Sequence, residues 1–310
     1  MSERIHDDEP DTSEATVRTL LAAERPAWAN LPMEYLRSSG TDNAMWRLRL
    51  EVGDDLVVRL PRRQHAANKV EQEMQLLSAL STTPLAAVVG TPTVRHVGNP
   101  HEVFPHRWSV LDWLEGTDAW SAQRAVSKNL DSLAVDLAEA VLAIADLAGL
   151  RAPERVPGGR GGPIGPLVRT LDRWLEDPQW NAAKLIDVAA VRRLASAALE
   201  VSTEPVVARF THGDLIPGNL LVADGRLTGI IDWGSAGYGD RAQDFAPAWA
   251  VLEADSRTAF RDAVAADEAT WIRARTFELE HSVGGVLYYV PRGHPLGEVM
   301  ARTLERILRD

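Results

Sequence analysis

Apolar and polar positions in the first third of the chain predict a short helix followed by a small antiparallel sheet. Residues 13–21 have apolar side chains at helical spacing. Between residues 34 and 60, two runs of strand-forming residues, 45–50 and 56–60, are separated by turn-forming residues. Because short turns between such runs are typical of antiparallel hairpins, we expect neighbouring strands here.

One helix and two further strands complete this part of the pattern. Apolar residues recur at helical spacing over residues 64–80. Strand-forming runs follow at 93–97 and 108–114. The first third of the chain is therefore expected to be a small sheet that carries one helix.

Past Gly116 the pattern becomes mainly helical. Residues 130–147 carry the apolar stripe of a long amphipathic helix, and a loop rich in proline and glycine, 153–166, interrupts it. We interpret that loop as a flexible connector. The remaining elements are helices at 167–176 and 188–200, a compact strand-like stretch at 206–231, and helical patterns after it.

Composition and charge exclude several kinds of protein. With 310 residues, 45% hydrophobic and 25% charged, the chain is long enough for two lobes with ordinary cores. The net charge of −11 argues against binding nucleic acid and would suit a cationic substrate. The absence of cysteine excludes disulfides and thiolate sites. With no apolar leader and no membrane-spanning run, we expect a cytoplasmic protein without a membrane partner.

Two short motifs carry the chemistry. Residues 212–219 read HGDLIPGN, so Asp214 and Asn219 have the spacing of the kinase catalytic loop H-R-D-x-x-x-x-N. Asp232 follows an apolar run that ends like a buried strand. Phosphoryl transfer needs a carboxylate that orients the attacking hydroxyl and hard oxygen ligands for Mg²⁺. Asp214 would be the catalytic carboxylate, and Asn219 and Asp232 the metal ligands.

Each motif alone also has a plain structural interpretation. Asp-Gly and Gly-Asn pairs are common in turns. His212, beside a strand end, is expected to be a structural histidine rather than a base. The two motifs in this order and at this spacing are nevertheless specific when taken together.

These motifs resemble those of the aminoglycoside phosphotransferase family, antibiotic kinases that share the protein-kinase-like fold with choline kinases and macrolide phosphotransferases. The carrying segments are residues 212–219, 231–233, 38–43 and 160–163. The resemblance covers nearly the whole chain beyond roughly the first dozen residues. It points strongly to the family and only weakly to a substrate.

The resemblance implies an α+β fold with two lobes. Residues 1–112 would form the N-terminal nucleotide-binding lobe, an antiparallel sheet with a helix, in which the polar residues 1–12 are expected to be disordered. Residues 113–310 would form a mainly helical C-terminal lobe that carries the catalytic and acceptor sites.

The resemblance also implies nucleotide contacts. Ser39 and Thr41 lie in a turn that is similar to the loop covering the phosphates. Arg59 stands where such kinases usually keep a lysine that grips the phosphates, which is a departure, although arginine binds phosphate well. Glu73 is expected to pair with Arg59, with Glu71 as the alternative.

Two further segments resemble known parts of the family. Residues 108–116 are similar to the hinge whose backbone binds a purine, with Leu111 and Trp113 as contacts, and they do not decide between ATP and GTP. Asp244, in the segment 239–245, is expected to cap a helix and to brace the catalytic loop rather than to touch the substrate.

We therefore expect a kinase that moves the γ-phosphoryl group of ATP or GTP, with Mg²⁺, to a hydroxyl group of a small molecule. The first candidates are antibiotics of the aminoglycoside or macrolide class. One alternative is a metabolite kinase similar to choline kinases, and another is a pseudokinase that binds a nucleotide without transfer, which Arg59 favours. The sequence fixes neither the acceptor nor the oligomeric state.

Other enzyme classes lack their motifs. The P-loop pattern, the dinucleotide-binding G-x-G-x-x-G, the metalloprotease H-E-x-x-H and the hydrolase G-x-S-x-G are all missing. Acidic residues toward the end of the chain are expected mostly to form a solvated face, with contact to a polycationic acceptor as the alternative. They are Asp255, Asp262, Asp267, Glu268, Glu278 and Glu280.

Overall fold

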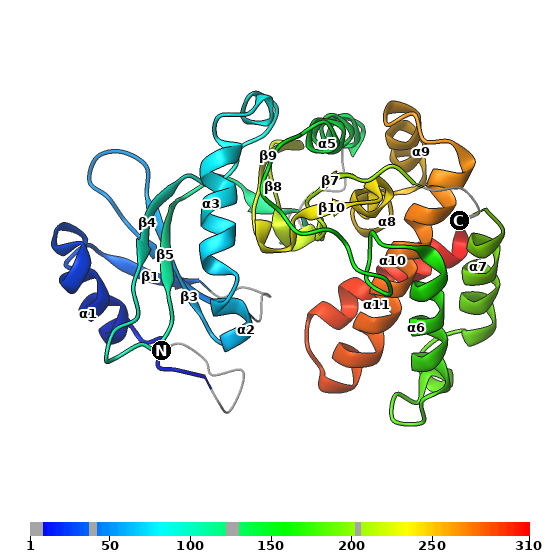
Figure 1. The fold of residues 1–310 in the computed structure, drawn as a ribbon, viewed down its shortest axis with the longest axis horizontal. Coiled ribbons are helices and arrows are strands. Elements are labelled where there is room, and N and C mark those ends of the chain that lie inside the picture. The colour runs from blue at the N-terminus through cyan, green and yellow to red at the C-terminus, as the bar shows by residue number, and fades with distance from the viewer. Residues whose placement is uncertain (1–8, 37–41, 122–129, 202–205) are drawn as a thin grey trace. The chain divides into compact units, whose positions relative to one another are not determined.

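The computed structural model describes residues 9–36, 42–121, 130–201 and 206–310 (Figure 1). The chain divides into two compact units. Unit 1 comprises residues 1–86 and 90–115, and unit 2 comprises residues 87–89 and 116–310. The assignment of nucleotide binding to residues 1–112 and of catalysis to residues 113–310 stays a prediction.

Unit 1 is built on an antiparallel sheet with the strand order β1-β2-β3-β5-β4. Every neighbouring pair in this order is antiparallel, as the hairpin pattern predicts. The strands are β1 (Met33–Leu36), β2 (Asn43–Leu48), β3 (Leu56–Pro61), β4 (Val94–Gly98) and β5 (Trp108–Asp112). The helices are α1 (Glu14–Glu24), η1 (Pro26–Trp28), α2 (Gln64–Ala67), α3 (Val70–Leu80) and η2 (Pro84–Ala87), the last ending in the first residue of unit 2.

Alternation along the strands forms the core of unit 1. In β2, Ala44, Trp46 and Leu48 are buried, and the residues between them are half-buried. Because successive side chains in a strand point to opposite faces, these three share one face. They pack with α1 and with β3 in one apolar cluster. Helix α3 contacts β4 and β5, and Figure 1 shows α1 and α3 on opposite sides of the sheet.

Two details of unit 1 differ from the sequence prediction. Glu9 is buried, and its carboxylate lies 2.6 Å from the buried guanidinium of Arg62. Residues 9–12 are therefore packed, and the disorder expected over 1–12 is wrong for this part. The single helix predicted over 64–80 is two helices, α2 and α3, separated at Asn68 and Lys69.

Unit 2 combines short strands with long helices. The strands β6 (Thr117–Asp118), β8 (Leu220–Ala223) and β9 (Arg226–Ile230) form one sheet, and β7 (Arg209–Thr211) and β10 (Gly237–Gly239) form another. The α-helices are α5 (Leu130–Ala145), α6 (Ile164–Glu176), α7 (Val188–Val201), α8 (Pro247–Ala250), α9 (Ala254–Ala263), α10 (Glu268–Tyr289) and α11 (Leu296–Arg309). Short 3-10 helices are η3 (Ala182–Lys184), η4 (Pro217–Asn219), η5 (Trp233–Ser235), η6 (Arg241–Phe245) and η7 (Val290–Arg292).

Helix α10 is the central helix of this unit. It contacts α6, α7, α11 and η6, and Figure 1 shows α6, α7 and α11 near it. Its first turn is capped by Asp267, whose side chain accepts the backbone N–H of Thr270 at 2.7 Å. Within the parts of the chain that the structure describes, no helix combines the length and apolar character needed to cross a bilayer.

Candidate active site

Residues 212–219, which the sequence predicts to be the catalytic loop and which keep that name below, follow strand β7 and include the 3-10 helix η4. The amide nitrogen Nδ2 of Asn219 donates to the carbonyl oxygen of Asp214 at 2.9 Å and to its carboxylate Oδ2 at 3.2 Å. These two bonds close the loop on itself and fix the orientation of the Asn219 amide. A spacing of four intervening residues therefore brings the side chains of Asp214 and Asn219 together.

A backbone bond brings the second motif to the first. The N–H group of Ile231 donates to the carbonyl oxygen of Asn219 at 3.0 Å, which places Asp232 beside the end of the catalytic loop. Asp232 has φ 64° and ψ 67°, a left-handed conformation that is unfavourable for a residue with a side chain. Strand β9 ends at Ile230, and the left-handed conformation of Asp232 turns the chain out of the strand direction.

His212 connects both motifs from within the core. Its Nδ1 accepts the backbone N–H of Asp214 at 3.2 Å, and its Nε2 donates to the carbonyl oxygen of Ile231 at 3.1 Å. An N–H group can only donate and a carbonyl can only accept, so the ring is neutral with its proton on Nε2. The ring is fully buried against Trp233, with centroids 4.6 Å apart. The geometry fits the structural histidine that the sequence predicts.

Asp244 holds the catalytic loop through hydrogen bonds to its backbone. Its carboxylate oxygens accept the backbone N–H groups of His212 at 2.6 Å and of Gly213 at 2.8 Å. Burial raises the pKa of Asp244 to about 6, although the two N–H groups and the charge of Arg155 act in the opposite direction. Bracing is thus as predicted. The capping role is wrong, because Asp240 caps η6 by accepting the N–H of Ala242 at 3.0 Å.

The donor set next to Asp214 fits a magnesium ion. Both hydrogen bonds of the Asn219 amide to Asp214 use Nδ2, and no described residue donates to its oxygen Oδ1. Asp232 is the next residue after Ile231, whose backbone N–H is bonded to Asn219. Carboxylate and amide oxygens are the hard ligands that Mg²⁺ takes in proteins. The assignment of Asn219 and Asp232 as ligands stays a proposal.

Residues 153–166 are not the flexible connector that their composition suggests. The backbone of Arg155 donates to Tyr238 at 2.8 Å, and Asp240 donates to Gly161 at 2.8 Å. The side chain of Arg155 donates to Thr211 Oγ1 at 3.0 Å. The segment is thus bonded to the strand pair that carries the catalytic loop, and its last residues begin α6.

This segment brings to the site Arg160, to which the sequence analysis gave no role, although residues 160–163 carried part of the family resemblance. The Nη1 atom of Arg160 lies 3.6 Å from the Oδ1 atom of Asp214. Glycines flank Arg160 on both sides, and two of them, Gly158 and Gly161, have φ of +87° and +75°. Such glycines permit a tight turn that a residue with a side chain disfavours. The Gly-Gly-Arg-Gly-Gly pattern of residues 158–162 could have indicated a site residue, since glycines on both sides favour a tight turn with a single side chain at its centre.

In unit 1 the pair expected between a strand and a helix is formed. Arg59 Nη1 donates to Glu73 Oε1 at 2.8 Å, and both residues are buried. Arg59 follows Val58 on β3 and therefore points to the opposite face of the sheet from that core residue. The alternative partner Glu71 is exposed and pairs with Arg107 at 2.7 Å. The role of the pair in binding phosphates stays a prediction.

The other predicted nucleotide contacts have mixed outcomes. Ser39 and Thr41 lie outside the described residues. Leu111 is buried within β5, and Trp113 lies under the guanidinium of Arg47, 4.0 Å from its ring centroid. The backbone N–H group of Trp113 donates to the carbonyl oxygen of Asp55 at 2.8 Å, so this group is not available to a purine. Any purine contact in this segment therefore uses other groups.

The acidic residues toward the end of the chain separate into two groups. Four are exposed on α9 or at the start of α10, as a solvated face predicts: Asp255, Asp262, Asp267 and Glu268. Glu278 and Glu280, further along α10, are buried. Burial raises the pKa of Glu280, while the charge of Arg160 lowers it. The carboxylate of Glu280 is thus within range of the same arginine that lies beside Asp214.

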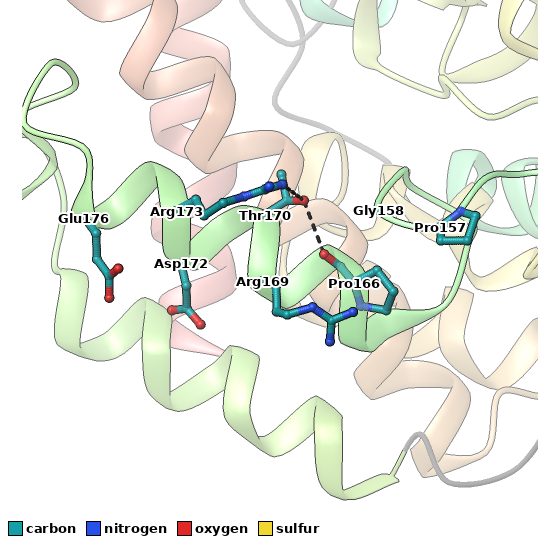
Figure 2. Close-up of a pocket in the computed structure, with 8 residues that line it drawn as sticks. All are labelled: Pro157, Gly158, Pro166, Arg169, Thr170, Asp172, Arg173 and Glu176. Atoms are coloured by element: carbon teal, nitrogen blue, oxygen red, sulfur yellow. Dashed lines mark hydrogen bonds between the residues drawn. The ribbon is translucent and has the colours of Figure 1, made fainter.

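A separate shallow hollow lies along α6. Figure 2 shows Pro157 and Gly158 on the loop that precedes the helix and Asp172 and Glu176 further along it. The same lining includes Arg169, Thr170 and Arg173, and none of the catalytic-loop residues. Arg192 of α7 lies 3.5 Å from Asp172 and 3.1 Å from Glu176, so the acids of this hollow are already paired.

Comparisons with known proteins agree with this geometry. A family model described as a phosphotransferase enzyme family matches residues 36–277. The aminoglycoside 3′-phosphotransferase of Escherichia coli is 42% identical over 74 residues, and the match spans 24% of this chain and only 24% of that relative's length.

Solved structures share the fold over nearly the whole chain. The GDP and kanamycin complex of APH(2″)-IIia has a TM-score of 0.72 at 20% identity, covering 94% of this chain and 97% of that one. The apoenzyme of macrolide 2′-phosphotransferase MphH from Brachybacterium faecium has a TM-score of 0.60 at 21% identity, covering 92% and 97%.

Together, fold and site define the class of kinase-like α+β phosphotransferases, and the α+β kinase-like prediction is confirmed. The chain belongs to the phosphotransferase enzyme family, because the family model matches well over half of it. The resemblance drawn from residues 212–219 and 231–233 is thereby confirmed at the level of the family, and so is the expected enzyme class.

Proposed function

We propose that the protein transfers the γ-phosphoryl group of ATP or GTP to a hydroxyl group of a small molecule, with antibiotics of the aminoglycoside or macrolide class as the candidates. Family membership and the relatives named above support this class of acceptor. The observation that carries the proposal is the closed loop in which Asn219 holds Asp214 and is joined by a backbone bond to Ile231, next to Asp232.

The catalytic loop supplies the positioning that this chemistry needs. Asp214 Oδ2 accepts from Asn219, whereas Oδ1 faces away from that amide. Oδ1 is therefore the oxygen that would accept the proton of an attacking hydroxyl. Asp214 keeps 23% of its side-chain surface exposed, which leaves it accessible to an acceptor.

Asn219 and Asp232 would hold the metal ion through Oδ1 and the carboxylate. A bound Mg²⁺ supplies neutralisation of the charge on the phosphate oxygens. His212, Asp244 and the backbone bond from Ile231 keep the catalytic loop in place before any ligand binds. Catalysis of this kind comes from positioning and electrostatics rather than from a covalent intermediate.

Release of nucleoside diphosphate tests the proposal. The assay uses the full chain with Mg²⁺, with ATP and with GTP, against aminoglycosides, macrolides and small amino alcohols. Asp214→Ala is expected to lower acceptor-dependent turnover by about 10²–10⁴-fold, because general-base catalysis contributes on that scale. Binding of Mg-nucleotide should persist in this variant. Asp262→Ala, an exposed aspartate on α9, is the matched control and should keep full turnover.

Three outcomes would change the conclusion. Full turnover in Asp214→Ala would refute the assigned role of this carboxylate. Turnover with amino alcohols alone would make the protein a metabolite kinase. Tight Mg-nucleotide binding without turnover on any acceptor would favour a nucleotide-binding pseudokinase.

A further inference from the structure

Arg160 lies beside Asp214, and the proposed chemistry gives it no task. Its guanidinium lies 3.6 Å from Asp214 Oδ1, the carboxylate oxygen that does not accept from Asn219. Arg160 and Asn219 therefore approach the carboxylate at different oxygens. Since Asn219 is the proposed metal ligand, Arg160 faces the oxygen that an acceptor hydroxyl would use.

The turn that carries Arg160 is held in place on both sides. Gly159 donates to Val156 at 3.2 Å and Gly162 donates to Gly159 at 3.2 Å, which closes two consecutive turns. A Cβ atom added at Gly161 would lie 2.1 Å from Gln243 Oε1. Gln243 in turn donates from Nε2 to the carbonyl oxygen of Gly213 at 2.7 Å. The backbone of Arg160 is thus fixed relative to the catalytic loop.

A second buried acid, Glu280, interacts electrostatically with the same guanidinium. Glu280 of α10 is only 8% exposed, and no described residue donates a hydrogen bond to its carboxylate or forms an ion pair with it. A carboxylate with such burial and no partner of its own is costly unless a positive charge is near. Arg160 is the cation that acts most strongly on it. One guanidinium therefore stands within range of Asp214 and of Glu280.

We propose that Arg160 selects the acceptor by charge: its guanidinium takes the position beside Asp214 that an ammonium group would otherwise occupy, and it favours acceptors that carry an oxygen next to the reacting hydroxyl. This inference rests on the proposed function and names the acceptor class of the same site.

The chemistry of the guanidinium explains the preference. Arginine donates hydrogen bonds and accepts none, so it can bind a hydroxyl, carbonyl or carboxylate oxygen but not an ammonium group. The separation of 3.6 Å is too long for a direct hydrogen bond to Asp214 and leaves both groups able to bond to one acceptor. An ammonium group entering here would meet a fixed positive charge at close range, which weakens its binding.

The test uses two aminoglycosides, neomycin and paromomycin, that differ by one amine replaced with a hydroxyl. Their dissociation constants are measured by calorimetry and their kcat/KM by diphosphate release, for the full chain and for Arg160→Gln. The unchanged protein should prefer paromomycin. Arg160→Gln should move the ratio of both quantities toward neomycin by about tenfold or more, because one nearby charge is removed.

Two further variants separate charge from structure. Arg160→Lys keeps the charge and should keep most of the preference. Arg173→Gln removes an exposed arginine of α6 in the same unit and should leave the ratio unchanged. The melting temperature of each variant shows whether it is folded.

Each outcome decides between the two proposals. Turnover with an unchanged acceptor ratio in Arg160→Gln would overturn the selection by charge and keep the kinase. A shifted ratio of dissociation constants without turnover in any variant would keep the selection by charge and overturn the kinase. Absence of binding of either aminoglycoside to the unchanged protein would overturn the selection by charge, and the kinase would then be decided by the diphosphate-release assay with macrolides and amino alcohols.

Discussion

At the scale of single residues, the site depends on buried polar groups whose partners are backbone atoms. Asp244 is 2% exposed and accepts two backbone N–H groups of the catalytic loop. His212 is fully buried and uses both ring nitrogens on backbone atoms. Such groups cost stability when a partner is removed, because the remaining donor or acceptor stays buried.

Asp244 should give the protein a measurable pH dependence. Its pKa of about 6 in the folded state lies above the ordinary value of 3.8, so the folded state binds the proton more tightly. The stability that this proton contributes is complete below pH 3.8 and is lost as the pH rises through about 6. Relative to Asp244→Asn, the free energy of unfolding should fall by about 3 kcal/mol between pH 3.8 and pH 7.

Denaturant titrations of both proteins across this pH range measure the difference. The Asn variant is expected to be less stable at every pH, since its NH₂ group faces one of the two backbone donors. A difference between the two proteins that stays constant with pH would contradict the raised pKa of Asp244.

At the scale of elements, the short turn at 158–162 places Arg160 next to Asp214. Its two left-handed glycines are not equivalent. A Cβ at Gly158 would have Thr170 Oγ1 as its nearest neighbour, at 3.7 Å, whereas a Cβ at Gly161 would lie 2.1 Å from Gln243 Oε1. This difference provides a matched pair of substitutions.

Gly161→Ala should lower both stability and turnover, while Gly158→Ala should lower stability only. Both changes force alanine into the left-handed region, at a cost of about 1–2 kcal/mol. Gly161→Ala adds overpacking of about 1–3 kcal/mol against Gln243, which is held by its bond to Gly213. Thermal unfolding and steady-state kinetics of the two variants measure the effects. Equal loss of turnover in both would show that the Gln243 contact does not matter.

Local patterns predicted the elements well where neighbours along the chain decide the structure. The alternation in 45–50 and the helical spacing in 13–21 gave strands and a helix with modest shifts at their ends. The spacing of Asp214 and Asn219 predicted a closed loop because that loop forms within a few residues. Strand β10 was missed, since a strand of three residues that begins and ends with glycine carries no periodicity.

The rest of the site depends on contacts between distant parts of the chain. Arg160 and Asp214 are brought together by bonds from 153–162 to Tyr238 and Asp240, which no local pattern encodes. The same holds for Glu278 and Glu280, whose burial depends on what packs around α10. Asp240 and Asp244 both lie in one short segment, and only the turn geometry decides which of them caps η6.

At the scale of the whole molecule, net charge and local charge act in opposite directions. The chain carries −11 overall, which attracts cations from a distance. Next to Asp214, in contrast, lies the positive charge of Arg160, 3.6 Å from the carboxylate oxygen Oδ1. Encounter with a cationic molecule and its binding beside the catalytic carboxylate are therefore controlled by different parts of the structure.

The overall charge predicts no useful affinity for nucleic acid. Duplex DNA binds proteins mainly through phosphates that release counterions to lysine and arginine, and an acidic protein repels it. In fluorescence anisotropy at about 0.1 M salt, a labelled duplex should show no binding at protein concentrations up to about 10⁻⁴ M. Salt-dependent binding below that concentration would reveal a basic surface that the net charge does not indicate.

The backbone of Asp232 has a consequence for how this chain varies over generations. At φ 64° glycine is the residue that fits without cost, so random substitution filtered by stability alone would drift toward glycine at this position. A chain that keeps aspartate there retains a strained residue for the sake of its carboxylate. Among copies that have lost their activity, position 232 should therefore be an early site of decay, with glycine as a favoured replacement.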